Sequence, residues 1–158
     1  MVENEALDME NIHLNLRRAD YRDIGFTYEL MHCCLGSYFR RNTQEGWSRQ
    51  KFREGYCPER IIIIEHEGMP IGFIDVEYRE NEAFFHNFEL AEDYRKGFLG
   101  IKLAKHFLER ARLNGAERAS AKVFTNNRCL ILFRRLGFEI TNMIEEENTF
   151  VISKVLES

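Results

Sequence analysis

The stretch YRKGFLG, residues 94–100, decides how this sequence is interpreted. It follows an apolar segment, residues 83–90, that is typical of a strand, and its last glycine opens an amphipathic helix. First-turn N–H groups of a helix have no partners within it, and the helix dipole favours negative charge there. Arg95 and Lys96 add positive charge, and the two glycines let a ligand approach the backbone. The stretch predicts a phosphate-binding turn. The alternative is an ordinary strand-to-helix turn with solvated cations.

Composition limits the class of protein. The 158 residues fit one domain with a real core, and 22 Lys+Arg against 26 Asp+Glu give a formal net charge of −4. This balance argues against a broad nucleic-acid-binding surface. No stretch is apolar enough to span a membrane and no signal peptide is visible, so we expect a cytoplasmic protein. We expect the acidic residues 1–11 to be a frayed leader and residues 12–158 to form a single domain.

The cysteine pattern does not predict a metal site. The four cysteines lie at positions 33, 34, 57 and 129, and no CxxC pair exists. His32 precedes the adjacent pair, but consecutive helix residues point in different directions and do not easily close on one ion. Buried free thiols in a reducing compartment are the expected state, and no metal is predicted.

Hydrophobic periodicity predicts a mixed α/β (α+β) domain in the order β-α-α-β-β-β-α-β-α-β-β. The four consecutive isoleucines at 61–64 indicate a central strand covered on both faces. The sheet is expected to be mostly antiparallel and flanked by helices, with a parallel, right-handed strand–helix–strand unit around the glycine at position 100. Strands are predicted at 13–17, 60–65, 71–78, 83–90, 119–124, from 138 and at 149–156, and helices at 24–35, 43–55, 100–114 and 130–136.

Three stretches carry a resemblance to the GNAT family of N-acetyltransferases. GMPIGF at 68–73 resembles the family's G-x-x-I/V-G hairpin, and residues 90–103 resemble its Arg/Gln-x-x-Gly-x-Gly/Ala pyrophosphate motif. NNRCLILFRRLGF at 126–138 resembles its N-x-x-A-x-x-L-Y-x-x-x-G-F block. Each motif alone is of moderate strength, but all three occur in order at the family's spacing. The resemblance covers almost the whole chain, from about residue 13 to 156.

The resemblance implies acetyl-CoA as cosubstrate. Backbone N–H groups of residues 95–100 would hold the pyrophosphate, and backbone groups of Phe88 and Leu90 would hold the pantetheine arm. In this family the strands ending near Leu90 and Phe124 splay apart to admit that arm. Asn126 or Asn127 would bind the cofactor, although either residue can instead cap the following helix. The implied cofactor-binding residues are Phe88, Leu90, Arg95, Lys96, Gly97, Phe98, Leu99, Gly100, Asn126, Asn127 and Phe133.

Two positions depart from the family pattern. Phe98 stands at the first glycine of the pyrophosphate motif, which is expected to alter the loop while leaving its N–H groups in place. Phe133 stands where many relatives carry the tyrosine that protonates the leaving thiolate. Phenylalanine has no proton to give, so another group or water would do this, or the reaction would be slower. A CoA thiol is acidic enough for such an acid to be dispensable.

The catalytic base is expected on the strand at 83–90, where relatives often place a carboxylate. An amine acceptor is mostly protonated at neutral pH and must lose a proton before it attacks a thioester. His86 lies four residues before Leu90, where relatives often have glutamate, and an imidazole suits this task. Glu89 is the alternative, and either residue can instead have a structural role. Strand alternation places His86 and Glu89 on opposite faces, so only one is expected to face the acceptor.

The sequence thus predicts an acetyl-CoA-dependent N-acetyltransferase that acts on a primary amine of a small molecule or peptide by direct transfer in a ternary complex. The alternative is a CoA-binding regulatory or non-catalytic protein on the same fold, which Phe98 and Phe133 motivate. The acceptor itself is not predicted, because loops vary freely on a shared fold. The tyrosines at 38, 56 and 78 and Trp47 are candidates for an aromatic acceptor pocket. The β-rich stretch 149–155, near a sheet edge, is compatible with a homodimer.

Overall fold

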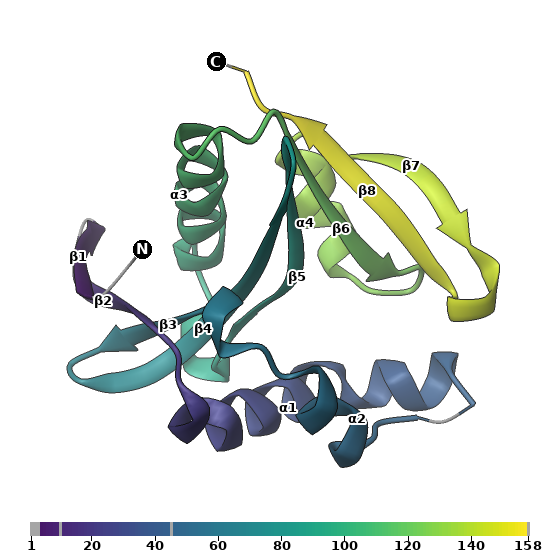
Figure 1. The fold of residues 1–158 in the computed structure, drawn as a ribbon, viewed down its shortest axis with the longest axis horizontal. Coiled ribbons are helices and arrows are strands. Elements are labelled where there is room, and N and C mark those ends of the chain that lie inside the picture. The colour runs from purple at the N-terminus through teal and green to yellow at the C-terminus, as the bar shows by residue number, and fades with distance from the viewer. Residues whose placement is uncertain (1–3, 10, 45, 158) are drawn as a thin grey trace.

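The computed structural model describes residues 4–9, 11–44 and 46–157. Within these residues, eight strands form one sheet in the order β1-β2-β3-β4-β5-β6-β8-β7 (Figure 1). Every neighbouring pair is antiparallel except β5 and β6, which are parallel. The elements are β1 (Asn4–Met9), β2 (Ile12–Arg18), α1 (Ile24–Asn42), α2 (Arg49–Gly55), β3 (Ile61–His66), β4 (Met69–Arg79), β5 (Glu82–Leu90), α3 (Leu99–Leu113), β6 (Arg118–Phe124), α4 (Cys129–Arg135), β7 (Glu139–Ile144) and β8 (Thr149–Val155). From β2 onward, the predicted order is confirmed.

The N-terminal residues are a correction to the sequence prediction. A frayed leader was predicted over residues 1–11, but Asn4–Met9 forms β1, which pairs antiparallel with β2. Leu7 and Met9 pack against the core beside Leu14. The carboxylate of Glu5 accepts a hydrogen bond from Arg110 of α3 at 3.1 Å. The acidic composition concealed a strand pattern in which every second residue turns inward. Residues 1–3 and 10 of the predicted leader lie outside the described residues.

The two faces of the sheet are covered by different helices. On one face, Leu103 and Phe107 of α3 pack in a core cluster with strand residues such as Ile64. On the other face, Leu30 and Met31 of α1 pack with Ile61, Ile63 and Phe73. The isoleucines of β3 therefore contribute side chains to the core clusters on both faces of the sheet. β3 itself lies between β2 and β4. Figure 1 shows α3 and α1 on separate sides of the strands. The predicted central strand is confirmed.

Helix α1 is longer than its sequence pattern indicated. The sequence predicted a helix over residues 24–35, yet the helix continues to Asn42, and Thr43 is its C-terminal cap. Gly36 is buried within α1 against the ring of His32, where an added Cβ would lie 2.8 Å from Cδ2. The second helix begins at Arg49, and its cap is Ser48, whose Oγ accepts a hydrogen bond from the N–H of Lys51 at 3.2 Å. The additional length carries α1 across to β6.

β5 and β6 separate after a short paired segment. They pair in parallel only from Glu82↔Arg118 to Phe85↔Ala121, and beyond that point no register joins them. Figure 1 shows the two strands meeting at one end and diverging toward α1. α1 spans the opening, because the Phe39 ring contacts Phe124 of β6 with ring centroids 5.1 Å apart. The structure therefore contains the splay that the family resemblance implied.

β8 is enclosed by its neighbours. It pairs with β6 on one side and with β7 on the other, over most of its length. The sheet edges in the described part of the chain are β1 and β7. Residues 149–153 of the stretch that prompted the expectation of a homodimer therefore have strand partners on both sides.

Candidate functional site

The loop between β5 and α3 presents a row of free backbone donors. The N–H of Arg95 already donates to Glu92 O at 3.1 Å, and the first hydrogen bond of α3 runs from Lys102 N–H to Phe98 O at 3.0 Å. Among the residues that the structure describes, none accepts a hydrogen bond from the N–H groups of residues 96–101. We call residues 96–101 the amide loop. Such consecutive donors at a helix start suit an anionic oxygen cluster.

The side chains of the amide loop leave these donors accessible. Phe98 is the N-cap of α3 with φ −103°, a conformation that requires no glycine, and its side chain is 72% exposed. Gly97 has φ +81°, which glycine adopts without strain. A Cβ at Gly100 would meet only Leu90 Cδ1, at 3.8 Å. The loop therefore needs glycine at position 97 and tolerates a side chain at position 98, which explains the departure from the family motif.

The Arg95 guanidinium has partners outside the amide loop. Its Nε donates to Leu90 O at 2.8 Å, and its Nη2 lies 3.1 Å from Cys34 Sγ on α1. The guanidinium therefore ties the end of β5 to α1 at the mouth of the splay. Lys96 is exposed and forms no ion pair within the described residues, so it is the cation available to the amide loop.

A β-bulge in β5 overturns the predicted alternation of His86 and Glu89. Asp75 of β4 pairs with Asn87, while the next residue, Val76, pairs with Phe85, which leaves His86 as the extra residue. His86 and Asn87 consequently both line a pocket beneath α1. The prediction that His86 and Glu89 lie on opposite faces is therefore wrong, because strict alternation fails at a bulge.

Beyond the bulge, regular alternation resumes. Phe88 turns toward α3, with its ring centroid 6.4 Å from that of Phe107. Glu89 pairs with Phe73, which packs against α1, so both side chains lie on the α1 face. His86 and Glu89 are thus on the same side of the sheet, separated along β5.

The pocket under α1 has a volume of about 190 Å³, and we call it the α1 pocket. Apolar and aromatic side chains form much of its wall. The ion pair between Asp75 of β4 and Arg60, in the turn before β3, forms another part of it. The residues that line it are Thr27, Met31, Lys51, Phe52, Gly55, Tyr56, Arg60, Ile61, Phe73, Asp75, His86 and Asn87. A concave site of mixed apolar and polar character is typical of small-ligand binding. Sequence patterning missed Asp75, although an acidic residue inside the apolar strand segment 71–76 was a signal for it.

Charged side chains form the polar side of the α1 pocket. Arg60 donates from Nε and Nη2 to the two oxygens of buried Asp75, at 2.9 and 3.1 Å. His86 Nε2 lies 2.8 Å from Glu77 Oε1, and Arg79 donates to both oxygens of Glu77. The hydrogen bonds from Arg79, followed by that with His86, lower the pKa of Glu77 to about 2. Glu77 is therefore ionised across the physiological range.

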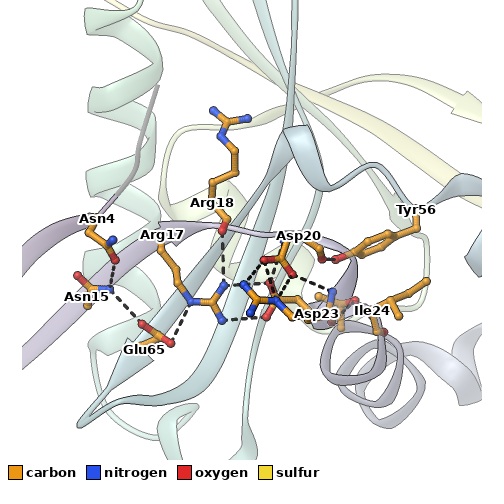
Figure 2. A network of polar contacts seen from close by, with 11 residues as sticks. Asn4, Asn15, Arg17, Arg18, Asp20, Asp23, Ile24, Tyr56 and Glu65 are labelled. Atoms are coloured by element: carbon orange, nitrogen blue, oxygen red, sulfur yellow. Dashed lines mark hydrogen bonds and ion pairs between the residues drawn. The ribbon is translucent and has the colours of Figure 1, made fainter.

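The helical wall of the α1 pocket is anchored by a second polar network. The hydroxyl of Tyr56 donates to Asp20 O at 2.7 Å. Arg17 donates to both oxygens of Asp23, at 2.8 and 2.9 Å, and to Glu65 at 3.0 Å. Figure 2 shows these groups converging where β2 ends and α1 begins. Because Asp23 immediately precedes α1, the network fixes the helix that carries Thr27 and Met31. Of the aromatic residues proposed for an acceptor pocket, only Tyr56 lines this one.

Glu89 lies near the mouth of the splay beside α1. Burial raises its pKa to about 7, although the Cys34 thiol and the charge of Arg95 act in the opposite direction. Burial also raises the pKa of Cys34 to about 12, so that thiol stays protonated. Glu89 can therefore take up or release a proton near neutral pH, but it does not line the α1 pocket.

The asparagines that follow β6 have different partners. Asn126 Oδ1 accepts a hydrogen bond from Asn42 Nδ2 at 3.1 Å, which joins the end of α1 to this turn. Asn127 Oδ1 accepts from Cys129 N–H at 2.9 Å, so Asn127 caps the start of α4. Phe133 packs against Phe138, with ring centroids 5.7 Å apart, in the cluster over β6. Phe133 itself has no hydroxyl, so it cannot act as a proton donor.

Within the described residues, no helix is long and apolar enough to cross a membrane. The described chain also contains no group of three or more His, Cys, Asp or Glu residues arranged to hold a metal ion.

Comparisons with known proteins identify relatives of this arrangement. A model of the acetyltransferase (GNAT) family matches residues 20–138. An L-methionine sulfoximine/L-methionine sulfone acetyltransferase of Pseudomonas aeruginosa is 28% identical over 109 residues, which cover 65% of this chain. Those residues cover 62% of that relative, so the chain spans less than two thirds of its length.

Solved structures show the same fold. Ard1 from Thermoplasma volcanium matches with a TM-score of 0.72 and 20% identity, over 92% of this chain and 99% of that chain. PaiA N-acetyltransferase from Thermoplasma acidophilum, solved in complex with coenzyme A, matches with a TM-score of 0.65 and 16% identity, over 90% of this chain and 98% of that chain. At these identities, the likeness concerns the fold.

Proposed function

This chain belongs to the acetyltransferase (GNAT) family, and we propose that it transfers an acetyl group from acetyl-CoA to a primary amine of a small molecule or peptide, directly within a ternary complex. The observation that carries this proposal is the amide loop beside the splay between β5 and β6. Its free N–H groups suit the pyrophosphate of CoA, and the opening provides unpaired strand edges for the pantetheine arm. Coenzyme A in the related PaiA structure supports the cosubstrate.

The acceptor amine is proposed to enter through the α1 pocket. The pocket adjoins β5 on the α1 face, and its volume of about 190 Å³ suits a small molecule or a single side chain. The Pseudomonas aeruginosa relative is named for acetylating L-methionine sulfoximine and L-methionine sulfone, which supports a small-molecule amine. The acceptor would approach the thioester from the side of His86.

His86 is the base that this arrangement favours. A base must reach the proton that it removes, and His86 lines the α1 pocket whereas Glu89 does not. Glu89 is the alternative base, because burial raises its pKa to about 7 beside Phe88 and Leu90. Asn126 and Asn127 are proposed to contact the cofactor through side-chain NH₂ groups, which donate to none of the described residues.

The alternative function is CoA binding without turnover. Phe133 favours it, because the side chain supplies no proton to the leaving thiolate. Calorimetric titration with acetyl-CoA, followed by a thiol-release assay over a panel of small amines and peptides, separates the two functions. The enzyme is expected to bind acetyl-CoA and to release CoA with at least one amine. Tight binding with no release on any amine would favour the non-catalytic function, and absence of binding would refute both.

A further inference from the structure

Glu77 of β4 contacts two charged or titratable residues that line the α1 pocket, His86 and Arg60. Its Oε1 lies 2.8 Å from His86 Nε2 and 3.3 Å from Arg60 Nη1, and its Oε2 accepts from Arg79 Nε at 3.0 Å. Glu77 pairs with Phe84 in the sheet register. The Phe84 ring packs edge-on against the His86 imidazole, with ring centroids 4.7 Å apart. The imidazole is thus fixed by a carboxylate at one nitrogen and by an aromatic ring at its side.

The charge on Glu77 determines which imidazole nitrogen carries the proton. An ionised carboxylate only accepts hydrogen bonds, so the nitrogen 2.8 Å away, Nε2, must be the donor. In the neutral ring the other nitrogen, Nδ1, is then unprotonated. No described residue forms a hydrogen bond with Nδ1, and His86 lines the α1 pocket. The arrangement leaves a basic nitrogen available to a ligand in that pocket.

We propose that Glu77 is a positioning residue, which holds His86 in the tautomer with Nε2–H and thereby makes Nδ1 the proton acceptor of the acetyl transfer. This inference rests on the proposed function. A carboxylate that orients a catalytic imidazole also stabilises the imidazolium that forms during proton transfer. The bulge at His86 is what brings the ring onto the face where Glu77 and the α1 pocket lie.

The acceptor ammonium gives one proton to Nδ1 of His86, which becomes imidazolium facing Glu77. The freed amine lone pair then forms the C–N bond with the thioester carbonyl carbon, and the C–S bond breaks with its electron pair on sulfur. The new amide nitrogen loses its second proton, the CoA thiolate gains one, and the imidazolium returns its proton to water.

Other charged or titratable groups lie around His86 besides Glu77, and they also affect how kcat depends on pH. Arg79 lies on the same strand as Glu77 and holds it. Asp75 and Arg60 are paired with each other across the pocket wall. Lys51 and Tyr56 face the pocket from α2 and the residue that follows it. Among the described residues, Glu77 is the carboxylate that hydrogen-bonds to the ring, so its substitution removes that contact while the Asp75–Arg60 pair remains.

The test is a double-mutant cycle. Glu77→Gln is expected to lower kcat about tenfold or more, with the KM for acetyl-CoA nearly unchanged, and to move the acidic limb of the kcat profile to lower pH. In the His86→Ala background the same substitution is expected to have no further effect on kcat. Equal losses in both backgrounds would overturn the proposal, because they would show that Glu77 acts only through Arg60 and Arg79. Glu80→Gln, in the exposed turn after β4, is the matched control.

A measurement on the unmodified protein makes the inference independent of variant folding. The ¹⁵N shifts of the His86 ring, measured above neutral pH, are expected to show a protonated Nε2 and an unprotonated Nδ1. The opposite tautomer would overturn the proposal, whatever the variants do. If no amine is acetylated by the wild-type protein, the proposed function fails, whereas an active protein that is insensitive to Glu77→Gln refutes this inference alone.

Discussion

The amide loop and the α1 pocket lie on two sides of the splayed strands and are built from different chemistry. The amide loop offers backbone N–H groups, and the exposed side chain of Phe98 supplies none of these donors. The α1 pocket depends on side chains that hold one another, such as His86 on Glu77 and Arg60 on Asp75. Backbone N–H groups remain after most amino-acid substitutions, whereas a side-chain network loses hydrogen bonds when any of its residues is replaced. The comparison implies that cofactor binding and acetyl transfer respond to different mutations.

Removal of the His86 ring is the substitution with the largest expected effect. His86→Ala is expected to lower kcat by about 10²–10⁴, because a positioned base contributes that much to proton transfer. Acetyl-CoA affinity, measured by calorimetry, is expected to stay unchanged, because the amide loop lies elsewhere. His13→Ala, at an exposed histidine of β2, is the control. An unchanged kcat would remove His86 as the base, and Glu89→Gln would then be the variant expected to lose activity.

A carboxylate introduced into the amide loop is expected to weaken cofactor binding and not acetyl transfer. Gly100→Glu is expected to weaken acetyl-CoA binding about 100-fold, because it places bulk and negative charge where the helix start favours an anion. Phe98→Ala is the matched comparison and is expected to change the dissociation constant by less than about threefold, because that side chain is exposed. Calorimetry measures both. Similar affinity for the two variants would mean that the phosphates bind elsewhere.

Glu89 makes a pH-dependent contribution to stability. Its pKa rises from an ordinary 4.5 to about 7 on folding, so the folded protein binds this proton more tightly than the unfolded chain. Stability is therefore lost as pH rises through this window, and the penalty is complete above pH 7, up to about 3 kcal/mol. Glu89→Gln cannot ionise, so its stability relative to wild type is expected to increase from pH 5 to pH 8 in urea unfolding. A difference that does not vary with pH would contradict the burial of this carboxyl.

The smallest expected effect concerns Phe133. Phe133→Tyr restores the hydroxyl of many relatives, but we expect kcat to rise by less than about threefold, because a CoA thiol is acidic enough to leave unaided. The thiol-release assay measures this, with thermal unfolding as a check that packing against Phe138 is kept. A tenfold rise would show that the missing acid limits turnover.

The parts of the molecule that repeat a family pattern could be predicted from the sequence. Four isoleucines at 61–64 identified the central strand, and residues 94–100 identified the start of α3 and the amide loop. These features rest on local periodicity and on backbone chemistry, which a sequence displays directly. The splay followed from the family resemblance and not from periodicity.

The remaining features depend on long-range pairing. The bulge at His86 exists because β4 and β5 change register between Asp75 and Val76, which no pattern within β5 reveals. The bulge places His86 on the opposite face of the sheet from the one that strict alternation predicted. β1 was missed because its inward positions include Glu5, whose partner Arg110 is distant in sequence. The pocket residue Asp75 was likewise hidden, because its partner Arg60 lies on another element.

One titration tests the central claim, that the cofactor is bound by backbone groups on one side of the splay and the acceptor by side chains on the other. Acetyl-CoA is added to ¹⁵N-labelled protein while amide chemical shifts are recorded. We expect the largest changes at the amides of residues 96–101 and at the end of β5, Phe88 to Leu90, with small changes at Asp75 and Glu77. Changes centred on the α1 pocket, with an unaffected amide loop, would contradict it.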